Sequence, residues 1–210
     1  MIDKDYIADH LDLAILRPTA TSDDVRCACA LANKHKIKSV CVAPGYVKLA
    51  ASLHNNVSCV IGFPNGNATP ATKYYEAVDA LRNGAKELDL VISYGAFLDG
   101  DPLPLLIELG LVVSATHQAG RIVKTILEVC YYTPTQLHHV CEICKDQGVD
   151  MLKTSTGFAD AGATVWAVET MLQYLPTKAS GGIKTNYDAE KYLSMGCARI
   201  GASNFARLLP

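Results

Sequence analysis

Ile122-Val123-Lys124-Thr125-Ile126-Leu127 is a short strand-like run, and the sequence that follows it decides the fold. Thr133-Pro134 then begins a helical pattern, and Gly148 stands just beyond its end. Met151-Leu152-Lys153 is a second strand-like run. A threonine before a proline is typical of a helix start, and a glycine is typical of the residue after a helix. The segment is therefore a strand–helix–strand unit, which implies two parallel strands joined by a right-handed crossover.

The same alternation extends along the whole chain. Strands are predicted over Leu11–Ala14, Ser39–Val42, Val57–Ile61, Glu87–Ile92, Ile122–Leu127, Met151–Lys153, Thr177–Ala179 and Arg199–Ile200. Helices are predicted over Ser22–His35, Gly45–Leu53, Pro70–Asn83, Pro104–Ala119, Pro134–Gln147, Ala163–Tyr174 and Tyr187–Met195, with a short last one over Ser203–Leu208. Eight such units predict a closed (β/α)8 barrel, a TIM barrel, in a single compact domain over residues 1–210. An open doubly wound sheet is the alternative, and a Rossmann fold is disfavoured because no Gly-x-Gly-x-x-Gly motif follows the first strand.

The bulk composition is that of an ordinary globular protein. The chain has 210 residues, of which 50% are hydrophobic and 19% charged, and a formal net charge of -2. This balance gives no electrostatic reason to expect a nucleic-acid partner. The start of the chain lacks a signal-peptide pattern, and the most apolar window, Leu103 to Ala115, is too short to span a bilayer. We therefore expect a soluble, cytoplasmic protein with no membrane partner.

Eight cysteines are scattered through the predicted helices and strands. Without an export signal, reduced and mostly buried thiols are favoured over disulfides. Cys141 and Cys144 form a Cys-x-x-Cys motif after His138 and His139, but no second ligand pair follows at a spacing that zinc would need. We interpret the motif as part of an amphipathic helix with buried thiols; a metal or redox role is the alternative.

Charged residues stand at strand positions where apolar residues are expected. These are Asp12, Asp89, Lys124, Lys153 and Lys178. If their apolar neighbours pack against the outer helices, the charged side chains face the barrel interior. Each one alone could instead be a snorkelling lysine or a capping aspartate at a strand end.

Five buried charges are costly unless they pair with one another or serve function. Three lysines and two aspartates leave one positive charge in excess. One lysine could remove that excess by staying neutral, and a neutral lysine is a nucleophile. Desolvation and a neighbouring ammonium both lower the pKa of a lysine, which is how lysines that form Schiff bases are prepared.

Glycine-rich turns follow the last two predicted strands. They read Gly181-Gly182-Ile183-Lys184 and Gly201-Ala202-Ser203-Asn204. Barrel enzymes commonly bind a substrate phosphate on backbone amides at these two places. Ser203 could donate from a turn, Lys184 adds charge, and Gly157 could complete the cradle. A pair of glycines alone usually marks only a turn.

The chain resembles the deoxyribose-phosphate aldolase family of class I aldolases over nearly its whole length. The run 152–158, Leu-Lys-Thr-Ser-Thr-Gly-Phe, is similar to the Schiff-base motif of that family, and the run 178–185 to its second-lysine motif. The runs 84–92, 62–66 and 199–203 also resemble family motifs, in the family's order.

The resemblance implies reversible cleavage of 2-deoxy-D-ribose 5-phosphate to D-glyceraldehyde 3-phosphate and acetaldehyde, in deoxyribonucleoside catabolism. It implies that Lys153 forms the imine, that Asp89 moves protons with a bound water, and that Lys178 lowers the pKa of Lys153 and joins the relay. Asp12 would orient this network. Cys41 stands where family members often have a cysteine near the substrate, although a buried thiol without a catalytic part fits equally well. No metal and no cofactor are implied, since the imine is covalent. A homodimer is common in such families, but no clear interface stripe stands out.

Three departures from the family pattern affect the expected site. Ala14 stands where a threonine is usual, and Lys184 and Asn204 stand where arginine and serine are more usual. The chain also stops at Pro210, without the tyrosine-ended tail of some members.

Three other functions remain as alternatives. A transaldolase-like Schiff-base barrel explains one lysine but not the 178–185 run. A phosphate-binding barrel without catalysis has no use for Asp89 and paired lysines. A metal-dependent aldolase needs clustered histidines at strand ends, and the six histidines fall mostly in helical or turn segments.

Overall fold

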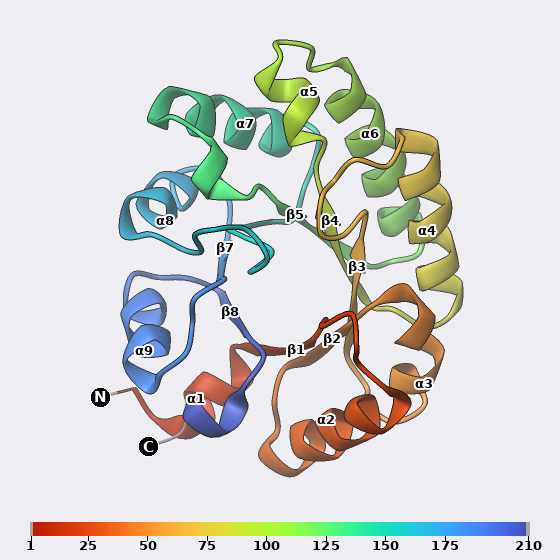
Figure 1. The fold of residues 1–210 in the computed structure, drawn as a ribbon, viewed down its shortest axis with the longest axis vertical. Helices are drawn as coiled ribbons and strands as arrows, with labels where there is room; N and C mark the ends of the chain where they lie inside the picture. Colours follow the sequence, from red (N-terminus) through yellow and green to blue (C-terminus); the bar gives the residue numbers. More distant parts are fainter. Residues whose placement is uncertain (1, 209–210) are drawn as a thin grey trace.

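The computed structural model describes residues 2–208, and its centre is a closed barrel of parallel strands (Figure 1). The strands are β1 (Leu11–Ile15), β2 (Ser39–Val42), β3 (Val57–Ile61), β4 (Glu87–Val91), β5 (Ile122–Ile126), β6 (Met151–Lys153), β7 (Thr177–Ser180) and β8 (Arg199–Ala202). Each strand pairs with its neighbours in chain order, and β8 pairs with β1 to close the ring. The predicted (β/α)8 barrel is confirmed, and the open doubly wound sheet is wrong.

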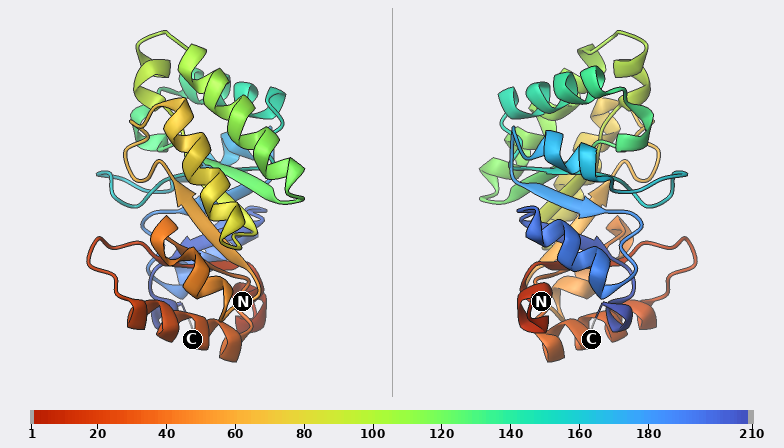
Figure 2. Two further views of the ribbon diagram at one scale, coloured as in Figure 1. Left: turned by 90° about the vertical axis from the view of Figure 1, so that its right-hand side faces the viewer. Right: turned by 90° about the vertical axis from the view of Figure 1, so that its left-hand side faces the viewer.

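Helices cover the outside of the barrel. The main ones are α2 (Ser22–His35), α4 (Pro70–Arg82), α6 (Leu103–Gln118), α7 (Pro134–Asp146), α8 (Val165–Met171) and α9 (Asn186–Ser194). Two side views show α4 and α6 running side by side on one flank (Figure 2). Thr21, Thr69 and Thr133 cap their helices by accepting a hydrogen bond from a backbone N–H of the first turn. These polar starts agree with the helix boundaries expected from the sequence.

The sequence-based boundaries fail mainly at short elements. The predicted helix over Gly45–Leu53 is a 3-10 turn, η1 (Pro44–Tyr46), followed by α3 (Val47–Ala51). The predicted helix over Ser203–Leu208 is only the 3-10 turn η3 (Phe205–Arg207), and Ala163–Tyr174 contracts to α8 because Thr164 caps it. Three elements were not predicted: α1 (Lys4–Asp9), α5 (Tyr94–Leu98) and η2 (Val129–Tyr131). Each has six residues or fewer, which is too short for a helical period to be recognised.

The two faces of the strands carry different chemistry. In β4, Leu88 and Leu90 belong to the apolar core between barrel and helices, whereas Glu87 and Asp89 are buried polar residues. Because side chains alternate along a strand, the two carboxylates share the opposite face, which is the barrel interior. The interior of this barrel is therefore partly filled by charged groups. Between residues 2 and 208, no helix is long and apolar enough to cross a membrane.

Candidate active site

Seven charged side chains lie together inside the barrel and at the mouth formed by the carboxyl ends of its strands. They are Asp12, Glu87, Asp89, Lys124, Lys153, Lys178 and Arg199, all of them buried. Strand register explains the grouping, because Asp89 is paired with Lys124, Lys153 with Lys178, and Lys178 with Arg199 on adjacent strands. The interior positions predicted for the two aspartates and three lysines are thus observed.

Asp89 is the centre of the cluster. Its Oδ1 accepts a hydrogen bond from Lys124 Nζ at 2.9 Å. Its Oδ2 accepts from Lys153 Nζ at 2.8 Å and from Lys178 Nζ at 2.9 Å. Burial alone would raise the pKa of Asp89, but the three ammonium groups hold it well below its usual value. Asp89 is therefore a carboxylate at neutral pH, and one of its oxygens joins the two lysines of the expected site.

Asp12 and Glu87 form a second layer of carboxylates below Asp89. Asp12 accepts hydrogen bonds from Lys178 and, at 2.6 Å, from Arg199 Nη1. Glu87 forms an ion pair of 2.5 Å with Lys124 and accepts from Arg199 Nη2 at 3.1 Å. These cations outweigh burial and lower the pKa of Glu87 to about 2. The arrangement orients Lys178 and Lys124 through fixed anions.

Glu87 and Arg199 were missed in the sequence, although a signal for Glu87 exists. It stands two residues before Asp89 in the same strand and so shares its face. Arg199 is the first residue of β8 and looks like a solvated strand end. With both included, the cluster has four cations and three carboxylates. The excess of one positive charge expected from the sequence therefore persists.

The two lysines of the predicted site differ in their surroundings. Lys178 donates to both Asp12 and Asp89, and these carboxylates overcome burial and raise its pKa. Among the described residues, the Nζ of Lys153 donates to Asp89 alone. Both side chains reach a cavity of about 330 Å³ at the carboxyl end of the barrel. Lys178 is thus fixed as an ammonium, and Lys153 is the lysine with fewer anionic partners.

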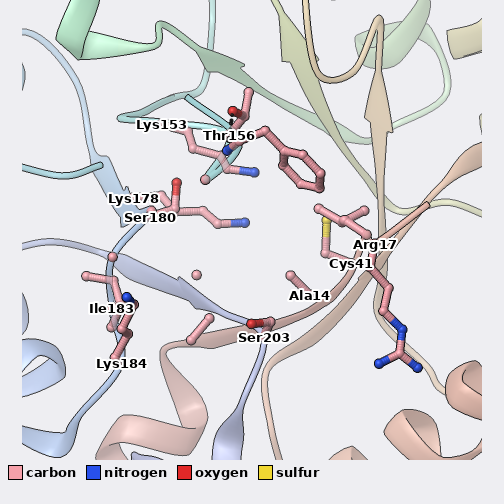
Figure 3. A pocket seen from close by; sticks show the side chains of 17 residues that line it. Ala14, Arg17, Cys41, Lys153, Thr156, Lys178, Ser180, Ile183, Lys184 and Ser203 are labelled. Carbon is pink, nitrogen blue, oxygen red and sulfur yellow. Dashed lines mark hydrogen bonds between the residues drawn. The ribbon is translucent and has the colours of Figure 1, made fainter. Parts of the chain in front are cut away.

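Figure 3 shows this cavity with Lys153 and Lys178 pointing into it from adjacent strands. Ser203 and Lys184 lie on one side, and Cys41 lies on another. Nine of the residues expected in the site line the cavity: Cys41, Lys153, Gly157, Lys178, Gly181, Gly182, Lys184, Gly201 and Ser203. Asp12 and Asp89 lie beneath the lysines and do not line it.

The glycines form one wall where backbone approaches backbone. Gly181 has a φ of 80°, and a Cβ atom on Gly162 would come within 2.1 Å of the Gly181 carbonyl oxygen. Gly157, Gly181 and Gly182 all have positive φ and line the cavity without side chains, which leaves main-chain groups facing it, as a phosphate cradle needs. Lys184 is exposed at its edge and uses its backbone N–H to donate to Asp188 Oδ2 at 3.0 Å. Its ammonium group is free of ion pairs within the described part of the chain.

Asn204 lies apart from the other residues expected to bind phosphate. It is absent from the wall of the lysine cavity and lines a neighbouring cavity of about 610 Å³ between the start of α2 and η3. Ser203, the residue before it, lines both cavities. The sequence also did not identify Arg17, Thr156 and Phe158 as residues that line the lysine cavity.

The cysteines are buried thiols at most positions. Burial raises the pKa of Cys41 to about 11, with Asp89 adding to the effect; its Sγ lies 4.0 Å from Asp89 Oδ2. Cys141 and Cys144 are fully buried in α7, and burial raises the pKa of Cys144 to about 12. Over residues 2–208, no group of three or more His, Cys, Asp or Glu side chains is placed to hold a metal ion.

Comparisons with known proteins agree with this geometry. A family model described as DeoC/LacD family aldolase matches residues 8–205. The deoxyribose-phosphate aldolase of Thermoanaerobacter sp. (strain X514) is 40% identical over 206 residues, covering 94% of this chain and 92% of that protein. The enzyme of the same name from Microcystis aeruginosa is 42% identical over 205 residues, covering 94% of this chain and 89% of that protein.

Two solved structures are similar over almost the full chain. The aldolase QR15 superposes with a TM-score of 0.93 at 34% identity, covering 99% of this chain and 95% of QR15. The deoxyribose phosphate aldolase from Aeropyrum pernix, described as a unique tetramer, has a TM-score of 0.90 at 30% identity and coverages of 98% and 90%.

Proposed function

The chain belongs to the DeoC/LacD family of aldolases, and from this premise we propose that it is a class I aldolase that uses Lys153. The proposed reaction is the reversible cleavage of 2-deoxy-D-ribose 5-phosphate to D-glyceraldehyde 3-phosphate and acetaldehyde, in deoxyribonucleoside catabolism. Its main support is the contact of Lys153 and Lys178 with one oxygen of Asp89 at the wall of a substrate-sized cavity. The barrel uses strands from β1 to β8, so the proposal treats residues 1–210 as one domain.

Lys153 is the proposed nucleophile. Its amine adds to the C1 carbonyl of the open-chain sugar, and loss of water gives a protonated imine. The imine accepts the electron pair of the C2–C3 bond when the C3 hydroxyl loses its proton, which yields an enamine and the glyceraldehyde phosphate. Protonation of the enamine and hydrolysis of the resulting imine release acetaldehyde and restore the amine.

Asp89 is the proposed proton carrier, acting with a water molecule. In the free protein its carboxylate is held by three ammonium groups, which makes it a weak base. Conversion of Lys153 to an imine removes one of the two donors to Oδ2 and leaves Lys178 as the other, which makes the carboxylate a stronger base. The proton lost by the sugar hydroxyl can then pass to Asp89 through water. Lys178 supplies a fixed positive charge beside the reacting nitrogen, and Asp12 keeps Lys178 in place.

The proposed phosphate site is the wall formed by the glycine turns. Backbone amides around Gly157, Gly181, Gly182 and Gly201 approach the anion, Ser203 donates, and Lys184 supplies charge. An exposed lysine in place of arginine offers a point charge without a bidentate fork. Asn204 has no part in this site, because it faces the neighbouring cavity. Cys41 lines the substrate cavity as a neutral thiol.

The remaining parts of the proposal concern cofactor, location and assembly. We propose that no metal or organic cofactor is needed, so EDTA treatment should leave activity unchanged. All eight cysteines are free thiols, which supports a reducing compartment such as the cytoplasm. The proposed ligands are small phosphorylated sugars and aldehydes. A homodimer stays a prediction, and light scattering on purified protein at micromolar concentration tests it.

The test is chemical trapping. Incubation with acetaldehyde and sodium borohydride should add an ethyl group to Lys153, located by peptide mass spectrometry. Lys153→Met should abolish the adduct and the cleavage of deoxyribose 5-phosphate. An unmodified Lys153 in the folded wild-type protein, or an adduct on Lys178 instead, would overturn the assignment. Trapping without cleavage of this sugar would keep the Schiff-base lysine and reject the substrate.

A further inference from the structure

Glu128 is a buried acid beside the cavity that the proposed reaction does not use. It lies two residues beyond the end of β5, is 1% exposed, and has left-handed backbone angles of φ 58° and ψ 66°. Within residues 2–208, Lys36 is the one other non-glycine residue with positive φ, and it ends helix α2. Left-handed geometry is strained for a residue other than glycine. Such strain persists where surrounding contacts hold it in place, often beside a functional site.

The backbone around Glu128 has the pattern of a β-bulge. Leu127 N–H donates to the Lys153 carbonyl at 3.0 Å, and Val129 N–H donates to the Thr154 carbonyl at 3.0 Å. From the first of these hydrogen bonds to the second, the β5 side advances by two residues, from Leu127 to Val129. The β6 side advances by one, from Lys153 to Thr154. Glu128 is therefore the extra residue, inserted opposite the link between Lys153 and Thr154. A bulge re-aims the side chain that it carries, and bulges are common next to active sites.

The Glu128 carboxylate holds the loop that follows Lys153. Oε2 accepts from the backbone N–H of Thr156 at 3.2 Å, and the Thr156 hydroxyl also donates to it. The same hydroxyl accepts a hydrogen bond from the Phe158 N–H at 3.0 Å. One carboxylate thus fixes the stretch Thr156 to Phe158, and all three of its residues line the cavity.

The charge of Glu128 is also set by this site. Burial raises its pKa, and the Thr156 donors together with the Lys153 ammonium oppose that rise. Its oxygens do not bond to Lys153, so the carboxylate acts on the lysine through the loop and at a distance.

We propose that Glu128 is a positioning residue that, through Thr156, holds the 156–158 loop against the substrate cavity at a fixed distance from Lys153. This inference rests on the proposed function. The loop would hold the phosphate end of the sugar at the position where its carbonyl carbon reaches Lys153. The loop contributes to binding of the whole sugar and does not change the reactivity of the Lys153 amine. Imine formation with acetaldehyde, which is too small to span the cavity, should not need it.

The experiment separates these two steps in the full-length protein. Glu128→Ala and Thr156→Val each remove one half of the contact. Both are expected to lower kcat/KM for deoxyribose 5-phosphate by roughly 10- to 100-fold, mainly through KM, because misplacement by about 1 Å has effects of that size. Both should trap acetaldehyde on Lys153 at a rate within about twofold of wild type. Thr156→Ser keeps the hydroxyl and should lose less than Thr156→Val.

Lys36→Gly is the matched control, because it relieves the other positive φ far from the cavity and should leave both rates unchanged. The positioning role is wrong if Glu128→Ala and Thr156→Val keep wild-type kcat/KM, or if trapping and cleavage fall in parallel. Glu128→Gln keeps an oxygen for Thr156 and removes the charge, so its pH profile should match that of wild type. A displaced profile would assign proton transfer to Glu128 and overturn the inference. Absence of trapping in wild type would instead reject the proposed function.

Discussion

Lys153 and Lys178 stand side by side on adjacent strands and differ in the number of carboxylates that they contact. Both contact Oδ2 of Asp89, but only Lys178 also contacts Asp12. Removing a proton from Lys178 would leave two buried carboxylates with fewer cations, and its pKa is raised accordingly. The cluster holds four cations and three carboxylates, and Lys153 contacts one of these carboxylates, Asp89, which fits its proposed role as the nucleophile.

Asp89→Asn tests the proton-transfer role at the residue level. The amide cannot carry the proton of the sugar hydroxyl, so we expect kcat for cleavage to fall by at least about 100-fold. Trapping of acetaldehyde on Lys153 should persist, because the nucleophile remains. Steady-state assays and borohydride trapping on one preparation measure both. If Asp89→Asn cleaves the sugar at the wild-type rate, Asp89 is not the proton carrier.

Gly201→Ala tests how tightly Lys178 is held. A Cβ atom at Gly201 would lie 3.1 Å from Lys178 Cε and 3.0 Å from Ser180 Cβ, so the lysine side chain must shift. We expect a loss of about tenfold or more in kcat, because catalytic groups tolerate little displacement. Gly95→Ala is the control, since a Cβ there meets no atom within 4 Å. Equal kcat in both variants would show that Lys178 can move without consequence.

The sequence predicted the charged residues inside strand runs and Lys153 at the end of β6, and it missed Arg199 and Glu128, which stand at or beyond a strand end. Asp12 and Asp89 each stand between two leucines, and Lys124 stands between Val123 and Thr125 in register with Ile122 and Ile126, so alternation alone places them inside. Arg199 begins its strand, and Glu128 follows the end of its strand. The inward direction of the Glu128 side chain depends on a bulge, and a bulge is a property of two paired segments that one run of residues does not reveal.

At the scale of elements, strand register assembles the site. The pairing of β4 with β5 places Asp89 beside Lys124, and that of β6 with β7 places Lys153 beside Lys178. A shift of one residue in either pair would turn the charged side chains toward the apolar outer layer. The ion pairs that cross several strands therefore also specify the register of the barrel.

The barrel itself was predictable because its strands and long helices have strong local signals. All eight strands were identified and begin where predicted; β2, β3 and β6 also end there, β1, β4, β5 and β7 end one residue away, and β8 ends two residues later. The short α1 and α5 were not, because helices of this length depend on contacts with the rest of the fold and not on their own propensity. The closed ring also depends on the pairing of β8 with β1, which is the least local contact in the sheet.

Glu87→Gln tests the contribution of the cross-strand ion pairs to stability. The pKa of Glu87 is lowered from 4.5 to about 2, so its contribution is present above about pH 4.5 and is lost as pH falls through about 2. At pH 7 we expect the free energy of unfolding to fall by on the order of 3 kcal/mol. Urea unfolding at several pH values measures this, and the difference from wild type should shrink toward pH 2.

The exposed Glu142 of α7 provides the control, because Glu142→Gln should leave the free energy of unfolding unchanged within about 0.5 kcal/mol. If the free energy of unfolding lost in Glu87→Gln stays constant with pH, Glu87 stabilises the protein through packing and not through its charge.

At the scale of the whole molecule, the exposure of the eight cysteines reflects the packing of the helices against the barrel. Cys27 and Cys130 are exposed, and the other six are buried: Cys29, Cys41, Cys59, Cys141, Cys144 and Cys197. The Cys-x-x-Cys pair belongs to the core layer between α7 and the barrel, and Thr125 of β5 donates a hydrogen bond to Cys144 Sγ at 3.5 Å. A pair in this position packs as small apolar side chains do.

Thiol titration tests that packing. Two thiols of the native protein should react rapidly with Ellman's reagent, and all eight should react after denaturation. Reaction requires an accessible thiolate, and burial both shields Cys141 and Cys144 and raises their pKa. Alkylation followed by peptide mass spectrometry should find label on Cys27 and Cys130 in the native state. Rapid labelling of Cys141 or Cys144 would contradict the buried position of α7 and would restore a redox or metal-binding role for the motif.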